Sequence, residues 1–302
     1  MQRVLLIANA RAGSVSDRVK EVIVKALSAD FKLDVADTEA RGHAIELARD
    51  AAEQGFDAVL AFGGDGTINE VAQDLVETDV AMGVIPGGST NVMARSLGIP
   101  IDPVEATAFA ASHLRSGTKR RVNVGRIGAR YFLFSAGMGL DAEVVRRVEA
   151  DPEGKRAHAD RTFLANALKV GFTVYRGAEP AVTLETAVSQ PEKVLFSIVC
   201  NARPFTYFGR FPVDACPQAS LDKGLDFFGL KTLHALTIPR VVWAVFVSRS
   251  HVRWKNACYY PDVDAGSLRA TRPMPVQVDG DFIGELDRAA VRLVPNSLDL
   301  LV

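Results

Sequence analysis

Cysteine is scarce in this chain of 302 residues, and its scarcity excludes two ways of stabilising a fold. Cys200, Cys216 and Cys258 are odd in number, widely spaced and form no CxxC pair. A disulfide framework uses paired cysteines, and a structural zinc site uses closely spaced ones. We therefore expect neither, and we expect the protein to work in a reducing compartment.

Long apolar runs and a net charge of either sign are also lacking. The run Val241 to Val247 lies between Arg240 and Arg249 and is far shorter than the roughly 20 residues that span a bilayer. The run Val4 to Ala8 is too short for the apolar part of a signal peptide. Thirty-five basic and 36 acidic residues leave a net charge of -1, so no overall field attracts nucleic acid. These absences predict a soluble or peripheral protein that does not bind nucleic acid.

No Gly-Lys-Ser/Thr sequence occurs, which excludes a Walker-type phosphate loop. Two other patterns fail on inspection. The glycines of 137–142 fit a loose dinucleotide fingerprint, but no convincing acidic ribose ligand follows about 20 residues later. A calcium loop starting at Asp279 would place Ile283 at a ligand position and Ala290 where the bidentate Glu belongs. Any phosphate site must therefore be built differently.

What the first half does contain is a regular alternation of short apolar runs with helical patterns, from Arg3 to about Leu114. This rhythm predicts an α/β domain with a parallel sheet. Ligands of such sheets bind beyond the carboxyl ends of the strands. We expect strands at 4–8, 32–36, 58–62 and 81–85, and the loops 9–13, 63–67 and 86–91 at their carboxyl ends.

The loop Gly63-Gly64-Asp65-Gly66-Thr67 is the most informative stretch of the chain. Glycines let a backbone approach phosphates and tolerate the positive φ angles that turn successive N–H groups toward an anion. A helix expected from Ile68 would add its positive N-terminal end. Asp65 would repel bare phosphate, so it suggests a metal ion or a substrate hydroxyl. A tight turn with an Asp cap is the alternative, but it does not account for the glycine pair.

The other two loops carry similar chemistry. In 86–91, two glycines open the backbone, and Ser89, Thr90 and Asn91 offer donors and a helix cap. In 9–13, Asn9 and Arg11 could bring an amide and a cation to a nucleotide, although an exposed turn explains this loop equally well. Together the three loops predict a nucleotide site.

From about residue 119 the pattern changes to strand-like runs separated by turn residues, which predicts a β-rich antiparallel second domain. Strands are expected at 130–136, 181–187, 194–201 and 275–278, and helices at 163–175 and 238–247. The boundary is expected near Ser116 to Thr118.

These residues together resemble the diacylglycerol kinase catalytic family, which includes bacterial lipid kinases, sphingosine kinases and ceramide kinases. The resemblance covers nearly the whole chain. It rests on six segments in the family's order: 9–13, 63–70, 86–91, 137–142, 221–226 and 279–281. The chain departs from the family at Asp281, which is usually Glu, and at Val92, Asn123 and Lys223, where relatives often carry an acid or a different pattern.

The resemblance implies an N-terminal nucleotide domain (1–118, with 289–302 returning to it) and a β-rich lipid domain (119–288). It also implies ATP and Mg²⁺ as cofactors, with Asp281 as the general base and Asp65 as a residue that helps to place the metal. Phosphoryl transfer needs little beyond alignment, charge neutralisation and a proton acceptor. The residues implied in nucleotide binding are Asn9, Gly63, Gly64, Gly66, Thr67, Gly88, Ser89, Thr90 and Asn91.

The implied activity is transfer of phosphate from ATP to a hydroxyl of a lipid such as diacylglycerol, in the cytoplasm at the inner face of the membrane. A kinase of a soluble substrate, like NAD kinase, and a regulator without turnover are the alternatives. Trp243, Phe246 and Trp254 could touch acyl chains, but at helical spacing they are more often core residues. Basic side chains that could meet anionic headgroups, or be ordinary solvated charges, are Lys119, Arg120, Arg121, Arg146, Arg147, Lys155 and Arg156.

Overall fold

A computed structural model describes residues 1–9, 16–150, 165–167, 169–171, 173, 178–234 and 237–302. The chain forms two compact units. Unit 1 comprises Met1–Val124 and Pro295–Val302, and unit 2 comprises Gly125–Val294. The strands β5 (Arg120–Ile127) and β16 (Asp281–Leu300) run from one unit into the other. The domain boundaries inferred from sequence, near 118 and 289, lie a few residues before those of the units.

Unit 1 is built on a parallel sheet in the order β4, β3, β1, β2. Its strands are β1 (Arg3–Ala8), β2 (Lys32–Asp37), β3 (Ala58–Gly63) and β4 (Ala81–Pro86). Every residue of β3 and β4 is buried, as expected for central parallel strands covered on both faces. The end of β16 adds a parallel partner beside β4 through Leu300 and Met82, so the chain terminus completes this sheet.

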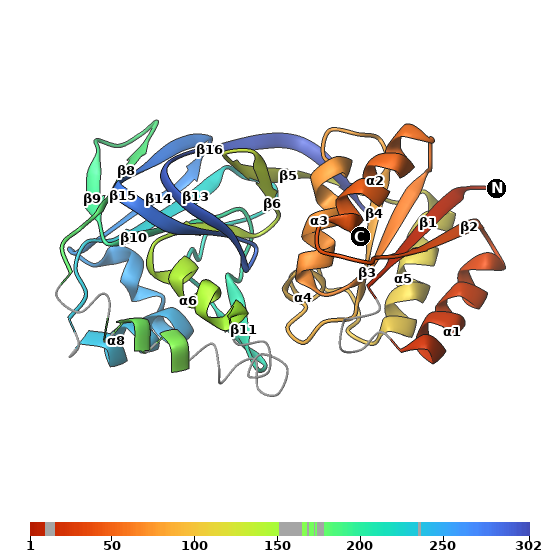
Figure 1. Ribbon diagram of the computed structural model, residues 1–302, viewed down its shortest axis with the longest axis horizontal. Helices are drawn as coiled ribbons and strands as arrows, with labels where there is room; N and C mark the ends of the chain where they lie inside the picture. The colour runs from red at the N-terminus through yellow and green to blue at the C-terminus, as the bar shows by residue number, and fades with distance from the viewer. Residues whose placement is uncertain (10–15, 151–164, 168, 172, 174–177, 235–236) are drawn as a thin grey trace. The chain divides into compact units, whose positions relative to one another are not determined.

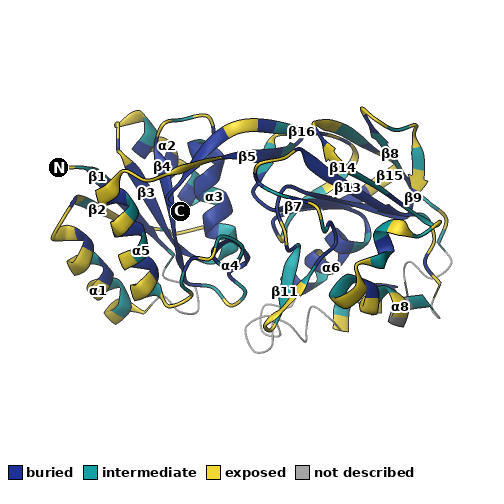
Figure 2. Cartoon of the chain, turned by 180° about the vertical axis from the view of Figure 1, so that it is seen from behind, coloured by how far each residue is buried: buried dark blue, intermediate teal, exposed yellow. Residues whose placement is uncertain are grey.

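Helices cover both faces of the sheet, as Figure 1 shows. The helices α1 (Asp17–Ser28) and α5 (Pro103–Ser116) pack together on one face, and α2 (His43–Glu53) and α3 (Asp65–Leu75) pack together on the other. The short helix α4 (Val92–Ser96) follows β4. Figure 2 shows the consequence for burial, with dark strands in the interior and exposed outer faces on the helices.

Unit 2 contains an antiparallel sheet in which β14, β13, β10, β7, β15 and β8 are successive neighbours. The chain therefore has the predicted fold class, a parallel α/β unit followed by a β-rich antiparallel unit. The strands of unit 2 are β6 (Arg130–Phe132), β7 (Ser135–Met138), β8 (Val182–Thr186), β9 (Glu192–Val194), β10 (Phe196–Cys200), β11 (Thr206–Phe208), β12 (Phe211–Val213), β13 (Leu225–Leu230), β14 (Ala257–Val263) and β15 (Ala265–Val278).

The helical segments of unit 2 within the described residues are short. They are α6 (Leu140–Glu149), α8 (Ile238–Trp243), the π-helical turn η2 (Ala244–Ser248) and the 3-10 turn η3 (Ser250–Arg253). Residues 165–167, 169–171 and 173 are also helical. Much of the helix predicted at 163–175 lies outside the described residues, as do Lys155 and Arg156. Trp243 is 61% exposed, so assigning it to the core was wrong. Across the described chain, no helix combines the length and apolar character needed to cross a membrane.

The single strand predicted over 130–136 is divided into β6 and β7, and Asp279 explains the division. Its carboxylate accepts the N–H groups of Leu133 (2.7 Å), Phe134 (3.0 Å) and Ser135 (2.9 Å). These groups turn toward one buried side chain instead of a neighbouring strand. Asp279 is 4% exposed, so these donors help to compensate for the loss of water around its carboxylate.

We expect Asp279→Ala to lower the free energy of unfolding by about 3–5 kcal/mol, because it leaves three buried N–H groups without an acceptor. Denaturant unfolding of the full chain measures this change. Asp287→Ala, an exposed position on β16, is the matched control and should cost less than about 0.5 kcal/mol. Equal losses in the two variants would contradict the role of Asp279.

Candidate functional site

The register of the parallel strands brings Asn9 and the loops 63–67 and 86–91 to one edge of unit 1. The rest of the predicted loop 9–13, including Arg11, lies outside the described residues. Ala8 pairs with Phe62, and Gly63 pairs with Pro86, so the chain leaves β1, β3 and β4 at the same level. Backbone bonds continue past the strand ends, from Asn9 N to Phe62 O (2.9 Å) and from Gly87 N to Gly63 O (2.7 Å). The fold therefore brings together the ends of β1, β3 and β4 and the two described loops, 63–67 and 86–91, as predicted.

The helix after β3 begins at Asp65, three residues before the predicted start at Ile68. Its first i→i−4 bond runs from Ile68 N to Gly64 O at 3.1 Å. The N–H groups of Asp65, Gly66 and Thr67 precede that bond and have no acceptor within the helix. They lie at the positive end of an eleven-residue helix, where an anion is favoured.

The glycines of the loops serve close packing, and the expectation that they adopt positive φ angles was wrong. None of Gly63, Gly64, Gly66 and Gly88 is among the residues with positive φ. A Cβ on Gly88 would lie 2.8 Å from Gly64 Cα, and one on Gly63 would lie 2.7 Å from the Thr67 hydroxyl oxygen. A Cβ on Gly64 would only make an ordinary contact of 3.5 Å. The two loops thus touch backbone to backbone, which leaves little side-chain cover above them.

Asp65 joins the first loop to the helix that follows the second. Its Oδ2 accepts the N–H of Val92 (3.0 Å), and its Oδ1 accepts the N–H of Met93 (3.1 Å). Asp65 thereby caps α4, whose own N-cap residue, Asn91, makes no side-chain cap bond. Burial raises the pKa of Asp65, and the donated N–H groups and the Arg95 charge offset only part of that rise.

The polar residues of the second loop divide into two kinds. Asn91 is buried and binds the loop itself, because its Oδ1 accepts Gly88 N (2.9 Å) and its Nδ2 donates to Gly88 O (2.8 Å). Its φ of 50° belongs to the left-handed region that Asn tolerates. Ser89 is exposed and Thr90 half-buried. Asn91 therefore shapes the loop, whereas the hydroxyl groups of Ser89 and Thr90 face the surroundings.

Asn9 and Thr67 connect the first strand to the first turn of α3. The Asn9 amide donates to the Thr67 hydroxyl oxygen at 2.9 Å. Thr67 is 6% exposed, and its hydroxyl hydrogen is still available as a donor. The pairing of these two predicted site residues could not be read from the sequence, because 58 positions separate them.

This arrangement fits the phosphates of a nucleotide. It offers the first-turn N–H groups of α3, two hydroxyl groups and a backbone surface without bulky side chains. It fits Mg²⁺ as a partial site, since Asp65 supplies one carboxylate and Mg²⁺ usually takes one or two, with substrate phosphates completing its shell. Among the described residues, no group of three or more His, Cys, Asp or Glu side chains could hold a metal ion alone.

Asp281 belongs to unit 2 and begins β16 immediately after a tight hairpin turn. Val278 pairs with Asp281 across this turn, whose two central residues, Asp279 and Gly280, have φ of 48° and 85°. Positive φ at both positions defines the two-residue turn that an Asp-Gly pair favours. Asp279 anchors the turn through its bonds to 133–135, and so fixes the start of the strand that carries Asp281.

Gln277 and Asp141 also support this hairpin, and the sequence reading missed both roles. Gly280 N donates to Gln277 Oε1 (2.9 Å), and Gln277 Nε2 donates to Asp141 Oδ2 (3.0 Å). Asp141 Oδ1 is buried and accepts no hydrogen bond. Burial raises the pKa of Asp141 to about 6, although the Gln277 bond lowers it. A Cβ on Gly137 would lie 1.8 Å from this carboxylate, which explains that glycine of the 137–142 segment.

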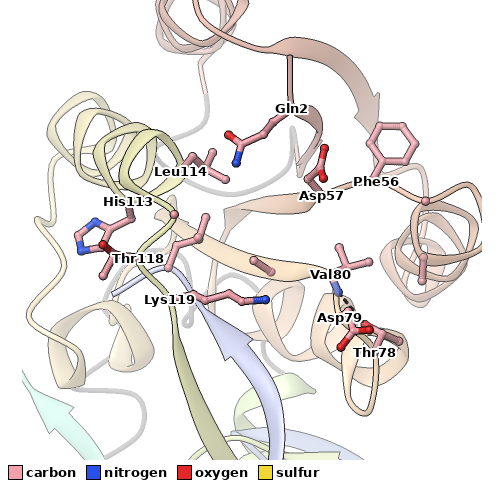
Figure 3. A pocket seen from close by; sticks show the side chains of 15 residues that line it. Gln2, Phe56, Asp57, Thr78, Asp79, Val80, His113, Leu114, Thr118 and Lys119 are labelled. Carbon is pink, nitrogen blue, oxygen red and sulfur yellow. Dashed lines mark hydrogen bonds between the residues drawn. The ribbon is translucent and has the colours of Figure 1, made fainter.

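Figure 3 shows the side chains that line a large cavity of unit 1, about 510 Å³ in volume. Gln2, Asp57 and Val80 line it, and each directly precedes or nearly precedes a strand of the sheet. The cavity is therefore at the amino edge, opposite the loops. Lys119, which also lines it, is engaged in an ion pair with Asp299 at 2.6 Å. Nothing connects this cavity with the phosphate chemistry of the loops.

Comparison with known proteins identifies the family to which this chain belongs. Residues 3–127 match the diacylglycerol kinase catalytic domain. The diacylglycerol kinase of Staphylococcus saprophyticus is 32% identical over 269 residues, 88% of this chain and 84% of that protein. The diacylglycerol kinase of Bacillus subtilis is 27% identical over 298 residues, 97% of this chain and 94% of that protein.

Solved structures of other proteins have the same fold as this chain. The crystal structure of a diacylglycerol kinase from Bacillus anthracis superposes with a TM-score of 0.75 at 23% identity, covering 99% of this chain and 96% of that one. The chain belongs to the diacylglycerol kinase catalytic-domain family, which confirms the family and the fold class predicted from its motifs.

We expect Gly88→Ala to destabilise the protein by about 1–3 kcal/mol, because its new Cβ would meet the Gly64 backbone at 2.8 Å. Gly64→Ala is the control, since its Cβ would make an ordinary contact at 3.5 Å, and it should change stability by less than about 1 kcal/mol. Thermal and denaturant unfolding measure both. The reverse order of the two losses would contradict the packing argument.

The raised pKa of Asp141 predicts a pH-dependent effect of Asp141→Asn. Because the folded-state pKa lies above the ordinary value of 3.8, this carboxyl stabilises the fold below about pH 4, and the contribution is lost as pH rises through about 6. The variant should therefore gain stability relative to the parent between pH 4 and 7, by up to about 3 kcal/mol. Unfolding across this range measures the difference. A difference between variant and parent that does not change with pH would refute the assignment.

Proposed function

We propose that this lipid kinase transfers the γ-phosphate of ATP, bound with Mg²⁺, to a free hydroxyl of a lipid such as diacylglycerol. The observation that carries the proposal is the meeting of the 63–67 and 86–91 loops beside the N-terminus of α3. Family membership and the names of the relatives support a lipid as the acceptor.

In this proposal unit 1 holds the nucleotide. The N–H groups of Asp65, Gly66 and Thr67 bind phosphate oxygens, and the hydroxyl groups of Ser89 and Thr90 donate further hydrogen bonds. Asn9, Gly63, Gly64, Gly88 and Asn91 keep the loops in place, and Asp65 contributes a metal ligand. Bound Mg²⁺ would supply positive charge that offsets the negative charge developing on the phosphates during transfer.

Unit 2 holds the lipid in this proposal. An apolar cavity of about 110 Å³ lies within it, lined by side chains that include Phe196, Phe228, Val241, Val245 and Trp254. Such walls suit an acyl segment better than a polar metabolite. An apolar cavity of this kind favours a lipid over the soluble substrate of an NAD kinase-like enzyme.

Asp281 acts as the general base. It accepts the proton of the lipid hydroxyl while the hydroxyl oxygen forms a bond to the γ-phosphorus, the bond from that phosphorus to the β-γ bridging oxygen breaks, and ADP leaves. The Asp-Gly turn, Asp279 and Gln277 position this carboxylate. The enzyme would work in the cytoplasm, peripherally bound to the inner face of the membrane that contains its substrate.

We expect Asp281→Asn to reduce phosphate transfer about 10²- to 10⁴-fold, because it removes the proton acceptor. The measurement is transfer of labelled phosphate from ATP to a panel of diacylglycerol, sphingoid base, phosphatidylglycerol and polyprenol. Asp287→Asn, on the same strand, should retain parent activity. Equal labelling by Asp281→Asn and the parent would remove Asp281 from this role.

The same panel separates the alternative functions. A soluble-substrate kinase would label NAD or another soluble acceptor and no lipid. A regulator would bind ATP, measured by calorimetry, yet label nothing. Either result would overturn the proposal of a lipid kinase reaction.

A further inference from the structure

Large apolar side chains are exposed together on one part of unit 2. Trp243 is 61% exposed, Val247 55% and Val242 37%, and Phe211 on β12 is 55% exposed. Only one other large apolar side chain among the described residues of unit 2, Val188, is classed as exposed. Val247 lies four residues after Trp243 and five after Val242, which places the three on one side of the continuous α8–η2 segment.

Two contacts join the β11–β12 hairpin to this helical segment. Asp214 N, at the end of the hairpin, donates to Val245 O at 3.2 Å. The rings of Phe208 and Phe246 pack edge to face with centroids 6.1 Å apart. Figures 1 and 2 both show α8 and the hairpin at the same edge of unit 2. We call Phe211, Val242, Trp243 and Val247 the Trp243 surface.

The chain around the Trp243 surface is basic although the whole protein is nearly neutral. Residues 227–261 contain no Asp or Glu, but they contain Lys231, Arg240, Arg249, Arg253 and Lys255. Such a segment stands out against 35 basic and 36 acidic residues in the full chain. Its charge is therefore a local property of this region.

Arginines next to the apolar side chains keep their charge at the surface. The Arg210 guanidinium lies over the Phe211 ring (5.3 Å), and that of Arg240 lies over the Trp254 ring (4.7 Å). Asp214, which is 2% exposed, pairs with two arginines, Arg203 (3.1 Å) and Arg249 (2.7 Å), so one carboxylate faces two cations. The net charge around this acid remains positive.

We propose that the Trp243 surface docks the enzyme on an anionic bilayer. Trp243, Val247 and Phe211 would enter the headgroup layer, where Trp is favoured, and the surrounding arginines would bind lipid phosphates. Exposed apolar side chains ringed by cations match a bilayer better than a neutral protein partner. This proposal rests on the proposed function, because a lipid kinase must reach a substrate that resides in a membrane.

Sedimentation of the full-length protein with vesicles tests the proposal. Binding to vesicles of phosphatidylcholine mixed with phosphatidylglycerol should exceed binding to phosphatidylcholine alone. The double variant Trp243→Ser/Val247→Ser should weaken it at least about tenfold. Arg210→Gln/Arg240→Gln should weaken it about fivefold for each arginine. The matched controls, Val188→Ser and Arg272→Gln/Arg288→Gln, alter exposed residues outside the surface and should bind like the parent.

Fluorescence gives a second readout, since Trp243 and Trp254 are the only tryptophans. In a Trp254→Phe background, anionic vesicles should shift the emission of Trp243 to shorter wavelength, and brominated lipid should quench it. Unchanged emission, or parent-like vesicle binding by both double variants, would overturn the proposal. A parent dimer that dissociates in Trp243→Ser/Val247→Ser would overturn it as well, because a second copy would then cover the surface.

Vesicle binding and phosphate transfer test the docking surface and the kinase reaction separately. Vesicle binding that depends on the Trp243 surface, together with no labelling of any lipid, would reject the kinase reaction and retain the docking surface. Labelling of lipid dispersed in detergent, together with vesicle binding unaffected by the variants, would do the opposite.

Discussion

The bond between the Asp65 carboxylate and the N–H groups of Val92 and Met93 is the interaction on which the candidate site depends. Parallel strands bring the ends of β3 and β4 together, but they do not fix the loops beyond them. Asp65 does so, because an ionised acceptor binds backbone donors about twice as strongly as a neutral one. With the loops held at this distance, only glycine fits at position 88, since any Cβ there would meet the Gly64 backbone.

In unit 2, Asp279 plays the same part, as a carboxylate that accepts several backbone N–H groups. A buried carboxylate collects N–H groups from Leu133, Phe134 and Ser135, and thereby holds the turn that precedes Asp281. Asp141 differs, because one of its oxygens has no donor and its pKa rises. Asp279 and Asp141 therefore differ in the number of hydrogen bonds that compensate for the burial of their carboxylates.

Much of this fold could be predicted from the sequence because it depends on patterns among residues that are close together in the chain. Apolar alternation located β1 to β4 within one residue at each end, and loop composition identified the edge that carries the candidate site. Three features depended on distant partners and could not be predicted. The helix α3 starts at Asp65, earlier than predicted. The strand predicted over 130–136 is interrupted because backbone N–H groups donate to Asp279 instead of to a neighbouring strand. Trp243, whose helical spacing suggested a core position, is exposed. An available signal was overlooked at Asp279-Gly280, since an Asp-Gly pair between two strands predicts a tight hairpin.

The different roles of the loop residues also bear on how the protein could bind phosphate without a Gly-Lys-Ser/Thr sequence. Without a Gly-Lys-Ser/Thr loop, the proposed phosphate site would use backbone N–H groups and hydroxyls, which bind by geometry more than by charge. Such a site would depend on the separation of the two loop backbones. Gly88 and Asn91 would then be as necessary as Ser89 and Thr90, because their bonds hold the second loop in its shape. Contact between the loops therefore explains the glycine at position 88, and contact with Thr67 of the same loop explains Gly63.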